Sequence, residues 1–331
     1  MKQIIVRLAL AFGLVWPALS AAPAQVDPDL AAFPPPGRLI QVEGRHMHLY
    51  CVGSGAPTVV LEDGQGGASL NWTWVQRDLV RTTRVCSYDR PGYGWSDPAD
   101  APMDATETSR QLAALLAAAN ETAPYLLVGH SLGGAYARLF ATQHRDAMAG
   151  LVLVDATHPS YLTAYAEAGF PRPEPSAVAT FLASHELLWR MATGAGIARA
   201  NAIIDANDFP ADVAPMMKAF LDSSRRKRIA VREIGSLHDT LVEIGALDSL
   251  GNLPVTVIAS DRWPDPDPAV AAHRAEWVKR LERQWLEIST NSKFMIVPGS
   301  DHLSLLTNRD HAAAVSDAVV AMIGHIRHRR R

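Results

Sequence analysis

The stretch that most constrains this chain runs from position 125 to 140. It begins with the apolar run YLLVGH, passes through a Gly-x-Ser-x-Gly motif centred on Ser131, and continues into AYARLF, which has the spacing of a helix. A strand, a sharp glycine-flanked turn and a helix form a nucleophile elbow, in which a strained turn exposes a serine hydroxyl above a sheet. The pattern predicts Ser131 as a nucleophile and the N–H of Leu132, at the helix start, as a donor to a developing oxyanion.

The rest of the chain alternates between strand-like and helical patterns. Short apolar runs, bounded by turn residues and separated by helical spacing, recur at 58–61, 83–88, 150–154, 253–259 and 293–297. Two more strands are predicted within 38–52. This alternation favours an α/β fold with a mostly parallel sheet of about eight strands and helices on both faces. From 159 to 250, prolines break short helical pieces, which predicts a helical cap inserted over the strand ends.

The N-terminus has the pattern of a targeting segment. Lys2 and Arg7 precede an apolar run at 8–19, and small residues follow. This predicts a signal peptide over 1–24, a periplasmic or secreted protein, and no stable membrane insertion after cleavage. A retained membrane anchor is the alternative, although the run is short for a bilayer and Pro17 interrupts it. The predicted organisation is then a Pro-rich linker at 25–37, a core at 38–158, the cap at 159–250, the second part of the core at 251–326 and a basic tail at 327–331.

Composition excludes little. A formal net charge of −3 gives no electrostatic argument for binding nucleic acid, so a small-molecule substrate is expected. The basic cluster 225–228 is predicted to be a solvated helix face.

Cys51 and Cys86 lie in predicted strands, and an oxidising compartment would permit a disulfide if those strands are neighbours. Two buried free thiols are the alternative, and the sequence leaves both open.

A serine nucleophile needs a base within hydrogen-bond reach and a carboxylate that orients the base. His302 follows the last predicted strand and should lie at the same sheet edge as the elbow; His158 is its best rival. Asp155 ends the strand after the elbow helix, and Asp261 follows the next strand. Both keep the order serine, acid, histidine, so the residues alone leave the acid open.

The loop after the strand 58–61 provides a second candidate oxyanion donor. Its sequence, EDGQGG at 62–67, is rich in glycines, which let backbone N–H groups approach a ligand closely. In serine hydrolases this loop supplies the second oxyanion donor, and the N–H of Gln65 is the candidate here. A mobile loop without function is the alternative.

Three motifs together resemble the α/β-hydrolase fold superfamily over roughly 38–325: GHSLGG at 129–134, DRPGYGWS at 89–96 and GSDH at 299–302. The resemblance implies a serine esterase-like enzyme that needs no metal or organic cofactor. Some members take their acid from the strand end that Asp155 occupies, which favours Asp155 over Asp261. The chain departs from the common pattern at Asp63-Gly64, where many members have His-Gly, and at 260–263, which lacks the usual acid spacing.

The implied reaction is hydrolysis of a small carboxylic ester through an acyl-enzyme. Aminopeptidase, amidase, lactonase, perhydrolase and carbon–carbon hydrolase activities use the same triad and stay open. Dehalogenases and epoxide hydrolases of this fold use an Asp nucleophile, whereas position 131 is serine. A non-catalytic ligand-binding protein on the same scaffold is a further alternative. The apolar cap residues are predicted to line a pocket or to pack the cap onto the core: Phe181, Trp189, Met216, Met217 and Phe220.

Overall fold

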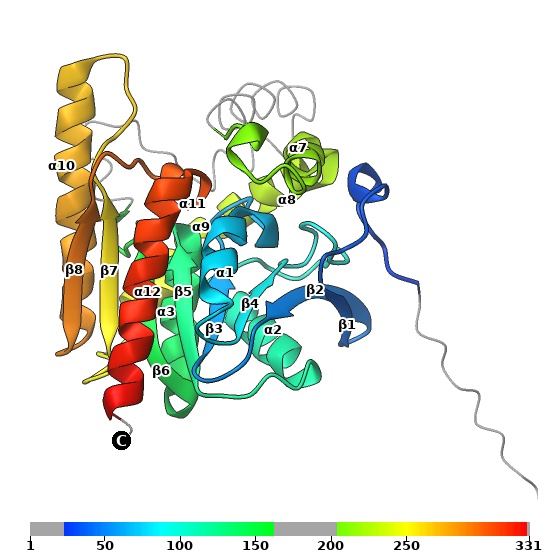
Figure 1. The fold of residues 1–331 in the computed structure, drawn as a ribbon, viewed down its shortest axis with the longest axis horizontal. Coiled ribbons are helices and arrows are strands. Elements are labelled where there is room, and N and C mark those ends of the chain that lie inside the picture. Colours follow the sequence, from blue (N-terminus) through cyan, green and yellow to red (C-terminus); the bar gives the residue numbers. More distant parts are fainter. Residues whose placement is uncertain (1–22, 162–203, 330–331) are drawn as a thin grey trace, which may run out of the picture.

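The computed structural model describes residues 23–161 and 204–329 (Figure 1). Most of the predicted signal peptide and part of the predicted cap lie outside these residues. Within them, no helix has the length and apolar character to cross a bilayer. The strands are β1 (Arg38–Val42), β2 (Arg45–Val52), β3 (Thr58–Glu62), β4 (Val85–Tyr88), β5 (Tyr125–His130), β6 (Met148–Val154), β7 (Val255–Ser260) and β8 (Ser292–Val297). The helices are η1 (Pro28–Leu30), η2 (Ser69–Trp72), α1 (Thr73–Leu79), α2 (Ala105–Ala118), α3 (Leu132–Gln143), η3 (Arg145–Ala147), η4 (Ala206–Asp208), α7 (Ala214–Asp222), α8 (Ser224–Gly235), α9 (Leu237–Gly245), α10 (Pro268–Gln284), η5 (Trp285–Ile288), α11 (Ser304–Thr307) and α12 (Arg309–Arg329).

The eight strands form one sheet in the order β1-β2-β4-β3-β5-β6-β7-β8. β2 pairs antiparallel with β1 and β4, and all other neighbours are parallel. The central strands β3, β5, β6 and β7 are buried along their whole length, as expected when helices cover both faces of a parallel sheet. The predicted α/β class and strand number are confirmed.

Alternate residues of each strand belong to two separate cores. Val59 and Leu61 of β3 pack with α1, α11 and α12, whereas Val60 packs with α2, α3 and α9 on the other face. Figure 1 shows α1 and α12 in front of the sheet and α2 and α3 behind it. These two layers hold the strands rigidly, so the loops at their carboxyl ends start from fixed positions.

Single residues of the predicted linker and of the basic tail contact the domain. Asp27, in the predicted linker, is buried and accepts a hydrogen bond from Ser223 Oγ at 2.5 Å. At the other end, α12 continues to Arg329, and Arg327 donates to the carbonyl oxygens of Ala56 and Thr82, both at 2.9 Å. Arg327 is exposed, and its guanidinium contacts these two loop carbonyls.

The described part of the predicted cap contains η4, α7, α8 and α9. α7 and α8 lie above the carboxyl ends of the strands (Figure 1), whereas α9 packs against α2 and α3. The prediction that 225–228 form a solvated face is wrong for two of the four residues. Arg225 donates to Gly94 O at 3.0 Å, and the buried Arg226 donates to Gly66 O at 2.8 Å. These side chains face the core because their donors satisfy carbonyl groups of core loops.

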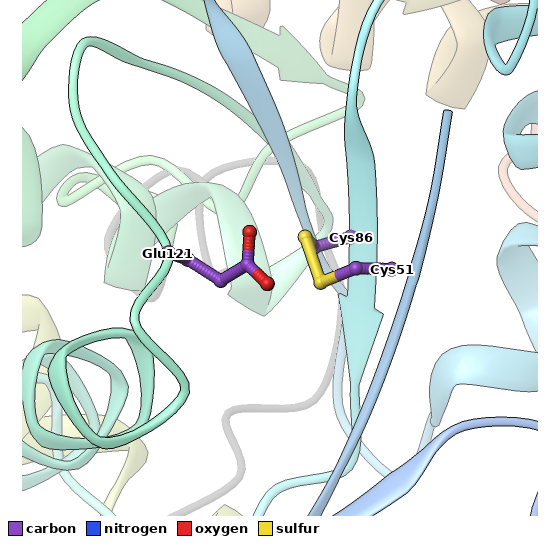
Figure 2. A group of neighbouring side chains, drawn as sticks. All are labelled: Cys51, Cys86 and Glu121. Carbon is purple, nitrogen blue, oxygen red and sulfur yellow. A yellow bond between two sulfur atoms is a disulfide. The ribbon is translucent and has the colours of Figure 1, made fainter. Parts of the chain in front are cut away.

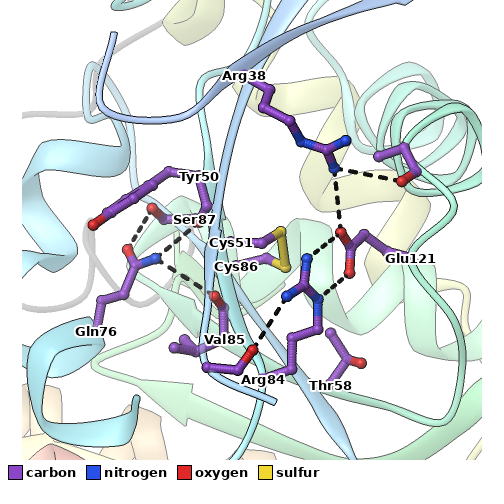
Figure 3. Close-up of a disulfide and its surroundings, with 12 residues drawn as sticks. Arg38, Tyr50, Cys51, Thr58, Gln76, Arg84, Val85, Cys86, Ser87 and Glu121 are labelled. Atoms are coloured by element: carbon purple, nitrogen blue, oxygen red, sulfur yellow. Dashed lines mark hydrogen bonds and ion pairs between the residues drawn. A yellow bond between two sulfur atoms is a disulfide. The ribbon is translucent and has the colours of Figure 1, made fainter. Parts of the chain in front are cut away.

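Cys51 and Cys86 lie directly opposite each other in the β2/β4 pair and form a disulfide (Figure 2). The structure thus meets the condition of neighbouring strands. The carboxylate of Glu121 points toward the sulfur atoms, but its oxygens are paired with two arginines (Figure 3). Arg84 contacts both oxygens, at 2.5 and 2.7 Å, and Arg38 contacts one at 3.5 Å. Glu121 therefore ties these arginines together beside the disulfide.

Candidate active site

Ser131 occupies the turn between β5 and α3 with φ 54° and ψ −126°, a strained conformation for a residue with a side chain. Its N–H donates to Val154 O, and its carbonyl accepts from Gly134 N–H, both at 3.0 Å. A Cβ atom at Gly129 would lie 2.5 Å from Gly133 O, so the close approach of turn and helix requires glycine. The predicted nucleophile elbow is present.

His302, in the loop between β8 and α11, reaches Ser131: its Nε2 lies 3.0 Å from Ser131 Oγ. The buried His130 supports that loop from below, since its Nε2 donates to His302 O at 2.9 Å. The rival His158 instead packs its ring edge-on to Trp285, at 4.8 Å between centroids, and burial lowers its pKa to about 4.

Asp155, at the end of β6, orients His302. Its Oδ2 lies 2.8 Å from His302 Nδ1, and its Oδ1 accepts from Ser260 N–H at 2.9 Å. Burial acts to raise the pKa of this carboxyl, but the hydrogen bond and charge of His302 and the N–H of Ser260 outweigh it, so the pKa lies below the usual 3.8. An ionised Asp155 accepts a hydrogen bond from Nδ1–H, so the ring proton stays on Nδ1 and Nε2 is free to accept a proton from serine.

Asp261 lies elsewhere. It accepts from Gly299 N–H at 3.0 Å and pairs with Lys279 Nζ at 3.0 Å, so it braces the turn that carries His302. The structure brings Ser131, His302 and Asp155 into one hydrogen-bonded chain and leaves Asp261 outside it.

The loop 62–67 lies against the elbow. A Cβ atom at Gly64 would be only 2.8 Å from Ser131 Cβ. Three of the four N–H groups of 64–67 donate, to the Asp63 carboxylate (Gly64), the Glu233 carboxylate (Gly66) and Gly64 O (Gly67). The N–H of Gln65 has no acceptor among the described residues, and that of Leu132 is a free first-turn donor of α3. Both residues line the same cavity as Ser131.

A buried charge network holds this loop, and sequence reasoning missed it. Arg90 pairs with Glu62 at 2.7 Å and with Glu233 of α8 at 2.9 Å. The same guanidinium donates to Asp63 O and Gly64 O, both at 2.6 Å. Glu62 and Arg90 follow strands and could have been suspected as partners, but no sequence pattern links them to a cap residue 143 positions beyond Arg90. Asp89, by contrast, braces its own turn by accepting from the N–H groups of Ser69 and Trp95.

We expect Glu233→Leu to lower the free energy of unfolding by about 3–5 kcal/mol, because it leaves the buried Arg90 with one carboxylate partner in place of two and the N–H of Gly66 with no acceptor. Urea unfolding measures the change. Glu233→Gln, which keeps an acceptor, should lose less. The control is Glu276→Leu, an exposed carboxylate paired with Lys279, which should change stability by less than about 1 kcal/mol. Equal effects in Glu233→Leu and Glu276→Leu would contradict this prediction.

Glu62 makes stability depend on pH. Burial raises its pKa from 4.5 to about 7 despite the nearby charge of Arg90. The folded state thus favours the protonated form, so this stabilisation is complete below pH 4.5 and is lost as the pH rises through 7. We expect wild type to lose on the order of 2 kcal/mol relative to Glu62→Gln between pH 5 and pH 8, measured by urea unfolding. A difference that grew in favour of wild type would contradict the sign.

The triad opens into a cavity of about 450 Å³. The cap contributes Ile234 and Leu237 to its wall, and α10 contributes Trp277 and Glu282. Of the cap residues predicted to line a pocket or to pack, Met217 and Phe220 are buried in a separate apolar cluster under the cap, with Met216 packed against it. Phe181 and Trp189 lie outside the described residues.

Comparison with known proteins identifies the family of this chain. Residues 53–318 match the model of the alpha/beta hydrolase family. An uncharacterised protein of Schizosaccharomyces pombe is 33% identical over 151 residues, which are 37% of this chain and 28% of that protein. The 2-hydroxymuconate semialdehyde hydrolase of Pseudomonas sp. is 30% identical over 128 residues, which are 38% of this chain and 45% of the enzyme. The chain thus spans less than half the length of these relatives.

Solved structures show the same fold. A thermophilic esterase from Thermogutta terrifontis has a TM-score of 0.63 at 19% identity, covering 87% of this chain and 98% of the esterase. The wild-type protein DBJA has a TM-score of 0.66 at 18% identity, covering 89% of this chain and 100% of that protein. At such identities the likeness establishes architecture only. The match to the family model extends over most of the sequence, and on that ground the chain belongs to the alpha/beta hydrolase family.

Proposed function

We propose that this protein is a serine hydrolase that cleaves small carboxylic esters. The observation that carries the proposal is the hydrogen-bonded chain from Asp155 through His302 to Ser131, 2.8 and 3.0 Å per link, at the wall of a cavity. A buried carboxylate, a histidine and a strained, half-buried serine at these distances are the arrangement that activates a hydroxyl for acyl transfer.

In the proposed reaction Ser131 Oγ attacks the ester carbonyl while its proton passes to His302 Nε2. Asp155 stabilises the resulting imidazolium. The N–H groups of Leu132 and Gln65 donate to the tetrahedral oxyanion. These donors lower the barrier strongly, because the negative charge of the transition state develops on that oxygen. Collapse of the intermediate expels the alcohol, which takes the proton from His302. Water then attacks the acyl-enzyme by the same route and releases the acid.

The test is turnover of p-nitrophenyl esters of increasing acyl length by the wild-type protein, with stoichiometric labelling by a fluorophosphonate probe. Turnover with labelling of one serine supports the esterase. Labelling without ester turnover would move the substrate to amides, lactones or peroxy acids. The absence of both labelling and turnover would favour a ligand-binding protein.

We propose further that the protein is exported to the periplasm or secreted. The support is the N-terminal pattern over 1–24 and the disulfide between Cys51 and Cys86, which an oxidising compartment maintains. N-terminal sequencing of the mature protein tests this, and a retained Met1 would contradict cleavage.

A further inference from the structure

Among the described residues that line the triad cavity, the ionisable ones besides the His302 base are all acidic: Asp155, Asp301 and Glu282. None of these described lining residues is lysine or arginine. An acidic lining of this kind disfavours an anionic substrate and favours a cationic one. Asp155 is already engaged by His302, and Asp301 accepts from the N–H groups of its own turn.

Glu282 is the carboxyl that the proposed ester chemistry does not use. It projects from α10, its side chain is buried, and it lines the cavity. The N–H of Ala156 donates a hydrogen bond to this carboxyl. The carboxyl oxygen Oε2, however, is shielded from solvent and has no hydrogen-bond partner in the described structure. Buried polar groups are almost always paired, so an unpaired one in the wall of a cavity indicates a partner that arrives with the ligand.

The electrostatics of Glu282 agree with a missing cation. Burial, together with the negative charge of Asp155, raises the pKa of its carboxyl well above the usual range. Without a ligand the carboxyl holds a proton; a positive charge brought beside it would favour the ionised form and complete the pair.

Three aromatic residues line the same cavity as this carboxyl: Tyr161, Trp263 and Trp277. The rings of Tyr161 and Trp277 are 6.1 Å apart between centroids. Aromatic faces attract ammonium groups through the ring quadrupole. Trp263 already contacts a cation, because the guanidinium of Arg274 lies 6.0 Å from its centroid. Aromatic rings and a buried carboxyl in the wall of one cavity are a combination that can recognise a protonated amine.

We propose that Glu282, with Tyr161 and Trp277, forms an ammonium-binding subsite beside the triad, so that the preferred substrates are esters carrying a protonated or quaternary amine. This rests on the proposed function, since it names the substrate class of the same site. Glu282 acts here as a specificity-determining residue: it contacts the remote amine and takes no part in the transfer of the acyl group.

Matched esters of one length test the proposal on the acyl side. They are the p-nitrophenyl esters of ε-aminocaproate, heptanoate and the pimelate monoanion, which end in an ammonium, a methyl and a carboxylate. Butyrylcholine and its carbon isostere, dimethylbutyl butyrate, do the same on the alcohol side. For at least one pair, wild-type kcat/KM should be about tenfold or more higher for the cation than for its neutral isostere, and the pimelate ester should be the poorest substrate.

The variant that decides is Glu282→Gln, which keeps size and hydrogen bonding but cannot ionise. In this variant the ratio of kcat/KM for the cationic ester to that for its neutral isostere should fall close to one. Turnover of the heptanoate ester should change by less than about threefold, because an equal loss for all esters would indicate a structural role. The control is Glu276→Gln, which changes an exposed carboxylate on the same helix and should keep the preference for the cationic ester. No preference for either cation in wild type, or one that persists in Glu282→Gln, would overturn the proposal.

Calorimetric binding of hexylammonium to the Ser131→Ala variant keeps the inference testable without turnover. Binding that is lost on adding Glu282→Gln supports the subsite even if no ester is cleaved, in which case only the esterase proposal fails. Binding that is absent, or insensitive to Glu282→Gln and to Glu282→Leu, overturns the subsite while leaving neutral-ester hydrolysis as a separate result.

Discussion

Replacing Ser131 with alanine should lower kcat for a p-nitrophenyl ester by about 10⁵–10⁶-fold, to the residual rate that binding and oxyanion donors alone provide. The reason is geometric: Ser131 Oγ is the hydroxyl 3.0 Å from His302 Nε2. The change removes one oxygen and leaves the strained turn in place, so folding should be preserved. Stopped-flow or long-time-course hydrolysis measures the rate.

The control for this variant is Ser54→Ala, a serine on an exposed loop, which should retain full activity. Fluorophosphonate should label wild type and Ser54→Ala and leave Ser131→Ala unlabelled. Undiminished hydrolysis by Ser131→Ala would overturn the acyl-enzyme mechanism as a whole.

The two aspartates should differ by orders of magnitude. We expect Asp155→Asn to lower kcat by about 10⁴-fold with little change in KM. Ser260 N–H donates to Oδ1, so an asparagine would keep its carbonyl there and turn its NH₂ group toward His302 Nδ1. Nδ1 must then accept, the ring proton moves to Nε2, and His302 can no longer take the proton of Ser131.

Asp261→Asn is the matched variant. Its carboxylate braces the turn at Gly299 and pairs with Lys279, and an amide oxygen can still accept from Gly299 N–H. Its kcat should stay within about threefold of wild type, with a small loss of stability. The ratio of the two variants, measured on one ester at neutral pH, identifies the acid. A large loss in Asp261→Asn with an active Asp155→Asn would reverse the assignment.

Several features could be predicted because they are encoded locally. The elbow at Ser131 depends on short-range sterics: an apolar strand, glycines where a Cβ would clash and a helix that begins at once. The position of His302 followed from topology, because the carboxyl ends of parallel strands meet at one edge of the sheet. The strands of Cys51 and Cys86 followed from the same pattern, but the sequence left open whether they are neighbours; the structure pairs them.

The choice between Asp155 and Asp261 was not available from the chain alone. The two residues follow adjacent parallel strands, β6 and β7, so topology places both near the elbow. What separates them is the direction of a single side chain, and that depends on partners far along the chain: Ser260 and His302 for Asp155, Gly299 and Lys279 for Asp261. Backbone pattern carries no information on such contacts.

By itself the sequence determined the architecture, the nucleophile and the general position of its base, because strand and helix periodicity and turn sterics act over a few residues. Only the tertiary structure decided which acid meets the base, which cap residue holds the loop of Gln65, and which carboxyl remains unpaired in the cavity. Glu233 and Glu282 show why: both are ordinary polar positions on amphipathic helices, and each owes its environment to long-range packing that buries it against another part of the chain.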